Sequence, residues 1–364
     1  MTVRTRLVAG MVAAVVLVGA GVGVGVVLGR GHGGGAAGAT TPGATTTGAP
    51  TLAALAEASG RTMGFALSPE LLAEPTFRAI ADKEFDLVVP ENAMKWERTE
   101  PERGRFDFTA GDQVADYAAQ SGKELYGHTL VWHNQLPSWV SSISSAEDLR
   151  AAMEAHIAGV VTHYAGRVTS WDVVNEAFDD SGARRATPFQ QLIGDDYMQE
   201  AFVAAHAADP AAHLCYNDYG IESVNPKTLA VLDMVKSLRA QGVPIDCVGV
   251  QAHLVLGQVP GDLQDVLARF VAAGVQVRIT ELDVRMPLSA DATALARQAD
   301  DYEAVVAACV AVQGCTGVTT WGLTDAHSWI PGWFDGYGSA LLWDESSAAK
   351  PAYDGVARGF ASAG

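Results

Sequence analysis

Positive charge is scarce in this chain of 364 residues, which has 24 lysines and arginines against 42 aspartates and glutamates. The first fifty residues hold three arginines and no acid, so the rest of the chain carries 42 acidic side chains against 21 basic ones. A domain this acidic repels a phosphate backbone, which excludes nucleic-acid binding as its main function. Hydrophobic residues nevertheless make up 49% of the chain, so wholesale disorder is excluded as well.

Motifs of several enzyme classes are absent. The chain has no G-x-S-x-G, which argues against a serine hydrolase, and no H-x-H or H-E-x-x-H, which argues against a metal-dependent hydrolase that uses His128, His133 and His253. Residues 33–38 satisfy G-x-G-x-x-G, but no predicted strand precedes them, so they do not indicate a dinucleotide site. We expect neither a metal ion nor any other cofactor.

Cysteine is also rare, with four residues at Cys215, Cys247, Cys309 and Cys315 and no C-x-x-C among them. An even count in an exported protein indicates disulfides, and four cysteines allow three pairings. A Cys309–Cys315 bridge would close a small loop after a helix and leave Cys215 with Cys247. Four free buried thiols are the alternative.

The amino terminus indicates export. Arg4 and Arg6 precede an uncharged stretch from Leu7 to Gly29, longer than the apolar core of about 7–15 residues that signal peptides have. This length favours a retained membrane anchor and its many glycines favour cleavage, so both interpretations of residues 1–30 stay open. In either case the rest of the chain is extracellular, secreted or tethered to the outer face of the membrane. Residues 31–50, rich in Gly, Ala, Thr and Pro, predict a flexible linker.

Eight short apolar or β-branched runs alternate with helical patterns after residue 60. They are Met63–Leu67, Asp86–Glu91, Glu124–Trp132, Val168–Glu176, His213–Asp218, Cys247–His253, Val275–Asp283 and Gly317–Leu323. This alternation predicts an α/β fold, a closed (β/α)₈ TIM barrel formed as one catalytic domain by residues 51–364. A doubly wound open sheet is the alternative, but the glycine-rich phosphate loop typical of it is missing.

Helix signals support this division. Ser144 and Glu147 fit a capping box before one helix, and Asn225 followed by Pro226 predicts the start of another that runs to Ala240. Residues 262–273 form an amphipathic pattern that Gly274 ends.

Polar residues collect where the predicted strands end. In chain order they are Glu91, Asn92, His128, Trp132, His133, Asn175, Glu176, Asn217, Asp218, Gln251, His253, Glu281, Asp283, Trp321 and Asp325. In a barrel the carboxyl ends of the strands form one rim, where active sites are built. We therefore expect these side chains to share a site.

Two carboxylates stand out, because an apolar strand leads into each of Glu176 and Glu281. A carboxyl pair that flanks a glycosidic bond, one protonated and one ionised, is the usual arrangement for glycoside hydrolysis. Asp283 lies on the same strand face as Glu281, and His253 on the neighbouring strand would orient Glu281 through a hydrogen bond. The alternative is that each glutamate forms a salt bridge at the rim.

Aromatic and polar residues at the rim suit a sugar ligand. Trp132, Trp321 and Trp329 would stack on the C–H faces of sugar rings, or else simply cover the barrel top. The side chains that would bond sugar hydroxyls are Glu91, Asn92, Lys95, His128 and Gln251.

Six strings over residues 55–360 resemble the xylanases of glycoside hydrolase family 10. They are PENAMKW at 90–96, GHTLVWH at 127–133, WDVVNEA at 171–177, QAH at 251–253, ITELD at 279–283 and TWG at 320–322. The resemblance implies a (β/α)₈ barrel that cleaves internal β-1,4 bonds of xylan with retention of configuration. It implies xylan and xylo-oligosaccharides as ligands, and we expect a monomer.

The resemblance also assigns roles. It implies that Glu176 is the acid/base, that Glu281 is the nucleophile, that Asn175 bonds the sugar 2-hydroxyl and that His253 and Asp283 orient the nucleophile. The side chains implied to line the sugar sites are Glu91, Asn92, Lys95, His128, Trp132, Tyr219, Gln251, Trp321 and Trp329. The family's disulfides match Cys215–Cys247 and Cys309–Cys315.

Two other functions remain to be compared. A binding-only barrel would lack one of the two carboxylates, and both are present. Within the family, a cellulose-type substrate is the nearest alternative, since the sequence does not show whether the extra hydroxymethyl group of glucose has room. The loop at residues 332–338 is rich in glycine and aromatic residues and leaves the preference of the distal sugar sites open.

Overall fold

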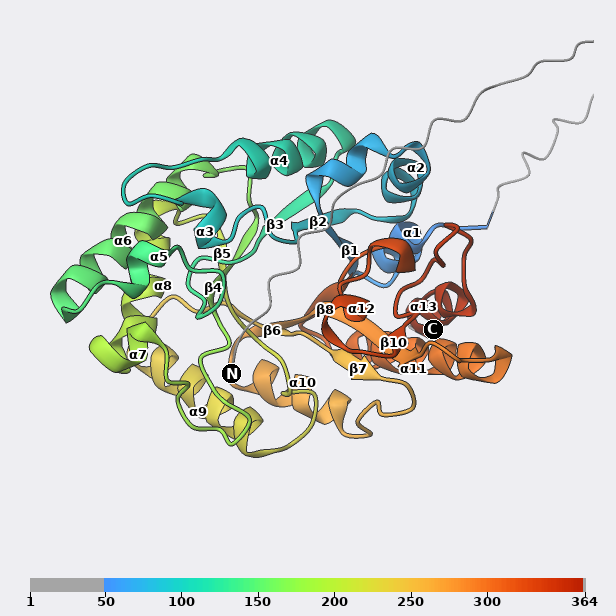
Figure 1. The fold of residues 1–364 in the computed structure, drawn as a ribbon. Coiled ribbons are helices and arrows are strands. Elements are labelled where there is room, and N and C mark those ends of the chain that lie inside the picture. Colours follow the sequence, from blue (N-terminus) through green and yellow to red (C-terminus); the bar gives the residue numbers. More distant parts are fainter. Residues whose placement is uncertain (1–48, 363–364) are drawn as a thin grey trace, which may run out of the picture. The chain divides into compact units, whose positions relative to one another are not determined.

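The computed structural model describes residues 49–362, which form a closed barrel of parallel strands with helices outside (Figure 1). The predicted signal or anchor segment and most of the predicted linker lie outside the described residues. Within residues 49–362 no helix combines the length and the apolar character that crossing a membrane requires.

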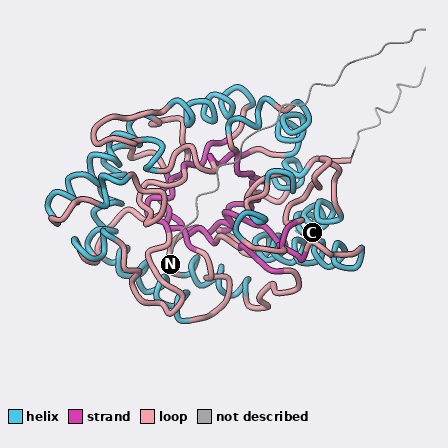
Figure 2. Tube along the Cα trace, viewed as in Figure 1, coloured by secondary structure: helices cyan, strands magenta, loops and turns pink. Residues whose placement is uncertain are grey.

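The barrel consists of eight strands, each paired in parallel with its neighbours (Figure 2). They are β1 (Thr62–Leu67), β2 (Leu87–Pro90), β3 (Glu124–Gly127), β4 (Ser170–Asn175), β5 (His213–Asp218), β6 (Cys247–Val250), β8 (Gln276–Pro287) and β9 (Cys315–Thr320). The ring closes because β9 pairs with both β8 and β1. The predicted (β/α)₈ fold is confirmed.

Helices follow the strands and cover the outside of the barrel (Figure 2). The longer ones are α1 (Leu52–Ala58), α2 (Pro75–Glu84), α4 (Thr109–Ser121), α6 (Ala146–His163), α8 (Asp196–Ala208), α9 (Pro226–Ala240), α10 (Leu263–Ala272), α11 (Ala292–Ala311) and α13 (Pro351–Ala361). Short helical turns lie in the loops at η1 (Pro69–Ala73), α3 (Trp96–Thr99), α5 (Ser138–Ser141), α7 (Pro188–Leu192), η2 (Asp325–His327) and α12 (Ile330–Trp333).

Several boundaries differ from the sequence-based expectation. The third strand ends at Gly127 rather than Trp132, so the GHTLVWH segment continues as an irregular loop over the rim. The cap of α6 is Ser145, whose side chain accepts from the Asp148 backbone N–H, so the predicted capping box of Ser144 and Glu147 was wrong by one residue. The predicted cap at Asn225 is confirmed, because its side chain accepts from the Thr228 N–H.

Two additional strands extend the barrel above β8. The short strand β7 (His253–Val255) pairs in parallel with β8, and β10 (Tyr337–Gly338) pairs with it in antiparallel. As a result β8 reaches beyond the predicted end at Asp283 to Pro287. The side chains near its end are therefore held on a rigid strand rather than on a loop.

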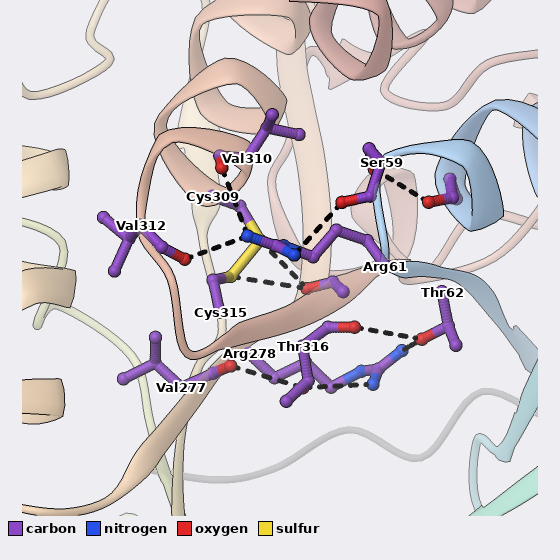
Figure 3. Close-up of a disulfide and its surroundings, with 12 residues drawn as sticks. Ser59, Arg61, Thr62, Val277, Arg278, Cys309, Val310, Val312, Cys315 and Thr316 are labelled. Carbon is purple, nitrogen blue, oxygen red and sulfur yellow. Dashed lines mark hydrogen bonds between the residues drawn. A yellow bond between two sulfur atoms is a disulfide. The ribbon is translucent and has the colours of Figure 1, made fainter. Parts of the chain in front are cut away.

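Two disulfides are present, Cys215–Cys247 and Cys309–Cys315, which confirms the expected pairing. The first joins neighbouring positions on β5 and β6. The second joins the end of α11 to the start of β9, beside the closing seam of the barrel between β9 and β1 (Figure 3). No free cysteine remains among the described residues.

Arg61 holds the same seam from the other side (Figure 3). Its Nη2 donates to the carbonyl oxygens of Val310 and Val312 at 3.2 and 3.1 Å, and its Nη1 donates to that of Ser59 at 3.1 Å. Nearby, the buried carboxylate of Glu84 accepts from the Leu52 N–H at 3.0 Å and from the Tyr353 hydroxyl at 2.9 Å. Both contacts tie the first helix of the domain to its last elements.

The Arg61 contacts predict a loss of stability on substitution. Arg61→Met removes charged donors from carbonyls of the α11–β9 turn, and we expect the free energy of unfolding to fall by about 2 kcal/mol. Urea unfolding measures it. Arg105→Met is the matched control, because within residues 49–362 the Arg105 side chain pairs only with Glu102, in an exposed i,i+3 bridge worth less than about 0.5 kcal/mol. Equal losses in the two variants would contradict a special role for Arg61.

Candidate active site

A cleft of about 740 Å³ opens where the barrel strands end. The two predicted carboxylates, Glu176 and Glu281, both line it. So do Asn175, His253 and all nine residues predicted to bind sugar, namely Glu91, Asn92, Lys95, His128, Trp132, Tyr219, Gln251, Trp321 and Trp329. Of the residues with a predicted catalytic, supporting or sugar-binding role, only Asp283 lies behind the cleft wall, fully buried. The structure therefore brings together side chains that are spread over more than 200 positions of the chain.

Glu281 on β8 is held between an amide from β5 and an imidazole from β7. Its Oε1 accepts from Asn217 Nδ2 at 2.7 Å, and its Oε2 lies 3.1 Å from His253 Nε2. The other ring nitrogen of His253, Nδ1, lies 2.9 Å from Asp283 Oδ2. Asp283, His253 and Glu281 thus form a chain of carboxylate, imidazole and carboxylate, which fixes the orientation of the Glu281 side chain.

The contacts within this chain set the charges of His253 and Glu281. Burial alone would lower the pKa of His253, but the Asp283 and Glu281 carboxylates outweigh it and raise that pKa to about 10. Burial would raise the pKa of Glu281, whereas its bond to His253 and the fields of His128 and His253 lower it below the usual range. An imidazolium therefore stands beside an ionised Glu281 at neutral pH, the state that a nucleophilic carboxylate requires.

Glu176 is positioned through its backbone. It has a φ of +57°, a left-handed conformation that is costly for a residue with a Cβ. The turn is held on both sides, because the Glu176 N–H donates to the Asn217 carbonyl at 2.9 Å and Arg185 Nε donates to the Glu176 carbonyl at 2.9 Å. Gln251 Nε2 donates to Glu176 Oε1 at 3.1 Å and fixes the carboxylate itself.

Amides connect the two carboxylates across the rim. Asn217, which donates to Glu281, also lies with its Nδ2 3.0 Å from the Asn175 amide. Gln251, which donates to Glu176, lies 3.3 Å from the same amide. Glu176 and Glu281 are therefore held in one hydrogen-bonded network and face one cleft.

A second group of polar residues lies at the end of β2. Lys95 Nζ donates to Asn92 Oδ1 and to Gln135 Oε1, both at 2.8 Å, and lies 4.8 Å from the centre of the Trp132 ring. Burial lowers the pKa of Lys95. Glu91 accepts from Asn92 at 3.1 Å, so the polar groups of this wall are oriented before any ligand arrives.

Buried partners also orient the aromatic wall of the cleft. Trp329 Nε1 donates to Asp283 Oδ2 at 2.8 Å, and the Trp321 ring lies edge-on to His128 with centres 5.2 Å apart. His128 Nδ1 in turn lies 2.8 Å from Asp172 Oδ2. The indole and imidazole rings thus present fixed faces to the cleft.

Tyr219 follows directly after β5 and also lines the cleft. Arg185 Nη2 donates to its hydroxyl at 2.8 Å, and the ammonium of Lys227 lies 3.4 Å from the centre of its ring. Lys227 also pairs with Asp218 at 2.8 Å. Two cations therefore hold this ring, which leaves its edge at the cleft.

Comparison with known proteins agrees with this geometry. Residues 51–359 match the profile of glycosyl hydrolase family 10. The chain belongs to this family. It is 46% identical over 310 residues to endo-1,4-beta-xylanase A of Phanerodontia chrysosporium, which covers 84% of this chain and 76% of that protein. Among solved structures, xylanase 10B of Thermotoga maritima is 40% identical with a TM-score of 0.84, covering 85% of this chain and 98% of the other.

A structure with a bound sugar is also similar. Xylanase 10B of Thermotoga petrophila, in complex with xylobiose, is 39% identical with a TM-score of 0.84, and the match covers 85% of this chain and 97% of that one.

Sequence reasoning missed several residues of the family 10 cleft. The structure adds Gln135, Arg185, Glu222, Arg285, Trp333 and Phe334 to its lining, whereas His133 was expected at the rim. Asn217, recognised only as a rim residue, is the second donor to Glu281. Most of these residues lie in loops, where no strand or helix period shows which way a side chain points.

Besides Asp283, three residues of the predicted rim do not line the cleft. Asn217 lies behind Glu281 and donates to it. Asp218 pairs with Lys227, and Asp325 pairs with Lys350 at 2.8 Å. Both are buried, and they support the loops above them. Within residues 49–362 no three His, Cys, Asp or Glu side chains are grouped so as to hold a metal ion.

The protonated His253 predicts how stability depends on pH. Between its ordinary pKa of 6.5 and its folded pKa of about 10, the folded chain keeps a proton that the unfolded chain has lost. The free energy of unfolding therefore falls as pH rises through this window. We expect the difference in this free energy between the unaltered chain and His253→Gln to shrink from pH 6.5 to pH 10 in urea titrations. A difference that stays constant would contradict the charge assigned to His253.

Proposed function

We propose that this chain is an endo-β-1,4-xylanase that hydrolyses internal bonds of xylan with retention of configuration. Its membership of glycosyl hydrolase family 10 and its identity to proteins named endo-1,4-beta-xylanase support the substrate. The observation that carries the chemistry is the cleft shared by Glu176 and Glu281, in which the lowered pKa of Glu281 keeps that carboxylate ionised.

The first step uses both carboxylates. Glu281 attacks the anomeric carbon while protonated Glu176 gives its proton to the departing glycosidic oxygen, so the carbon–oxygen bond to the leaving sugar breaks as a bond to Glu281 forms. His253 and Asn217 hold the two oxygens of Glu281 and steady it for the attack. Asn175, beside the network, is in place to bond the sugar 2-hydroxyl.

The second step reverses the roles. The Glu176 carboxylate takes a proton from water, whose oxygen attacks the same carbon from the side the leaving group vacated, and Glu281 departs. Two inversions give net retention. The amide of Gln251, 3.1 Å from Glu176 Oε1, bonds this carboxylate in the ionised state that the step needs.

The remaining lining binds the chain of sugars. Glu91, Asn92, Lys95 and His128 offer charged and amide groups to the hydroxyls, whereas Trp132, Trp321 and Trp329 offer flat apolar faces to the ring carbons. Tyr219 stands on the leaving-group side. A monomer suffices for this site, because both carboxylates and all of these binding residues come from one chain.

We further propose that the barrel works outside the cell, either released or anchored through residues 7–29. Two disulfides among the described residues support an oxidising compartment. An extracellular place also suits a substrate too large to enter a cell.

The two carboxylates predict different losses on different substrates. Glu281→Ala is expected to lower kcat by about 10⁵-fold or more on xylan and on an aryl xylobioside, since no covalent bond can form. Glu176→Ala should lose about 10²–10⁴-fold on xylan but much less in the first step on the aryl substrate, whose leaving group needs no proton. Steady-state and burst kinetics measure both.

Glu57→Ala, on the exposed side of α1, is the matched control and should keep full activity on both substrates. A Glu281→Ala variant as active as the unaltered chain would refute the assignment. Product analysis on a soluble cellulose derivative belongs in the same series, because cleavage there as fast as on xylan would contradict the substrate.

The location predicts where activity is found. When cells that express the full chain are fractionated, we expect xylanase activity in the medium or on the outer face of the cell membrane. Activity on the membrane should be accessible to added protease. An anchored form keeps residues 7–29 by mass spectrometry, and a cleaved form lacks them. Activity confined to the cytoplasm would contradict export.

A further inference from the structure

One wall of the cleft combines a cation with three aromatic rings, and we call Arg285, Trp329, Trp333 and Phe334 the arginine wall. All four line the cleft. The Arg285 guanidinium lies 4.0 Å from the centre of the Phe334 ring. The centre of the Trp329 ring lies 5.6 Å from that of Phe334 and 6.2 Å from that of Trp333, so the four side chains are contiguous.

Arg285 lies on the same strand as Glu281, close to the centre of the proposed chemistry. Glu281, Asp283 and Arg285 alternate along β8 and so belong to one strand face. Pairing of β8 with β7 sets Arg285 beside Val255, and its Nη1 lies 3.4 Å from the His253 carbonyl oxygen. Four residues of strand separate the two backbones by about 13 Å, so a group bound by Arg285 lies along the same cleft as a sugar bound over Glu281.

Among the described residues, Arg285 has fewer protein partners than Lys95 and Arg185, the other basic side chains besides histidine that line the cleft. Lys95 donates to two amide oxygens, and Arg185 donates to two carbonyls and a tyrosine hydroxyl. Arg285 makes one long bond to a carbonyl and no ion pair within residues 49–362. Most of its five N–H donors thus have no protein acceptor in that part of the chain, although a guanidinium fork matches a carboxylate closely.

Trp333 is unusual for a different reason. Its side chain is 73% exposed, the largest such value among the large hydrophobic residues of the described chain. It extends the row of rings from Trp329 outward, and Gly332 beside it leaves open space on the backbone. The uncovered indole of Trp333, which Trp329 and Phe334 connect to the Arg285 guanidinium, forms with it a surface for a ligand that has both an apolar ring face and a negative charge.

We propose that the arginine wall binds an acidic branch of the substrate, with Arg285 pairing with the carboxylate of a uronic-acid substituent on xylan and Trp333 packing against its sugar ring. This inference rests on the proposed xylanase function and adds a specificity to it. A neutral hydroxyl would leave the guanidinium charge unpaired, whereas a carboxylate accepts two parallel hydrogen bonds from it.

The charge of the whole protein sharpens the argument. With a net charge of −18, the protein repels free anions, so a small anion alone is not expected to accumulate at Arg285. A uronyl branch differs because the neutral backbone of the same molecule is held in the cleft, and the branch then meets Arg285 at a high effective concentration. The arginine wall therefore binds a charged branch only when the xylan backbone that carries it is already held in the cleft.

Three xylo-oligosaccharides with the same backbone test this: one carrying a single glucuronosyl branch, one with the carboxyl of that branch reduced to an alcohol, and one unbranched. The measured quantity is the ratio of kcat/KM for the acidic branch to kcat/KM for the reduced branch. We expect a ratio on the order of tenfold for the unaltered chain, as a charged hydrogen-bonded pair provides, and a ratio near one for Arg285→Gln. Arg285→Lys, which keeps the charge without the fork, should fall between them.

Two further variants separate the parts of the wall. Trp333→Ala should lower kcat/KM on both branched substrates relative to the unbranched one, while the ratio of acid to alcohol stays as in the unaltered chain. Arg105→Gln removes the same charge at an exposed pair with Glu102 and should leave every ratio unchanged. Any effect of Arg105→Gln equal to that of Arg285→Gln would show a general charge effect and overturn the site.

The outcome distinguishes this inference from the proposed xylanase function on which it rests. If the unaltered chain cleaves none of the three oligosaccharides, the xylanase proposal fails. If it cleaves them all with an acid-to-alcohol ratio near one, the xylanase proposal stands and the arginine wall is refuted. This second result needs no variant, so it holds even if Arg285→Gln does not fold.

Discussion

The site depends on one arrangement of charge, the buried chain from Asp283 through His253 to Glu281. An isolated carboxylate in this place would take up a proton, because burial favours the neutral form. The imidazolium between the two acids prevents this, and the second acid keeps the imidazole protonated. Glu281 thus remains negative without exposure to solvent, where hydration would weaken it as an attacking group.

The barrel makes this arrangement possible because its strands are rigid and nearly all of its interior is filled. His253 comes from β7 and the two acids from β8, and the pairing of His253 with Asp283 sets their spacing. Asn217 from β5 then connects Glu281 to the strand turn that carries Glu176. The backbones of the neighbouring strands therefore position each of the two carboxylates. The rotation of the glutamate side chain itself contributes less to that position.

Much of the fold and of the site could be predicted from the sequence, because the signals for both are local in the chain. Apolar strands that end in polar residues give the strand order and the rim, and the spacing of two between Glu281 and Asp283 puts both on one face. The error at Ser144 against Ser145 has a local cause too, since two adjacent serines compete for one cap. Arg285 and Trp333 were not predicted to line one wall, because one lies on a strand and the other in a loop over 40 residues later, and no period relates them.

The shared bonds of Glu84 bear on how the chain can be trimmed. Its carboxylate accepts from Leu52 at the start of the domain and from Tyr353 in α13, so a single side chain closes the polypeptide into a loop of some 300 residues. A protease that cut ahead of position 51 would break neither bond, and the remaining piece would be self-sufficient. A cut that removed either partner would leave the buried Glu84 carboxylate with one donor fewer beside Lys83, so the smallest excisable enzyme has to contain both Leu52 and Tyr353.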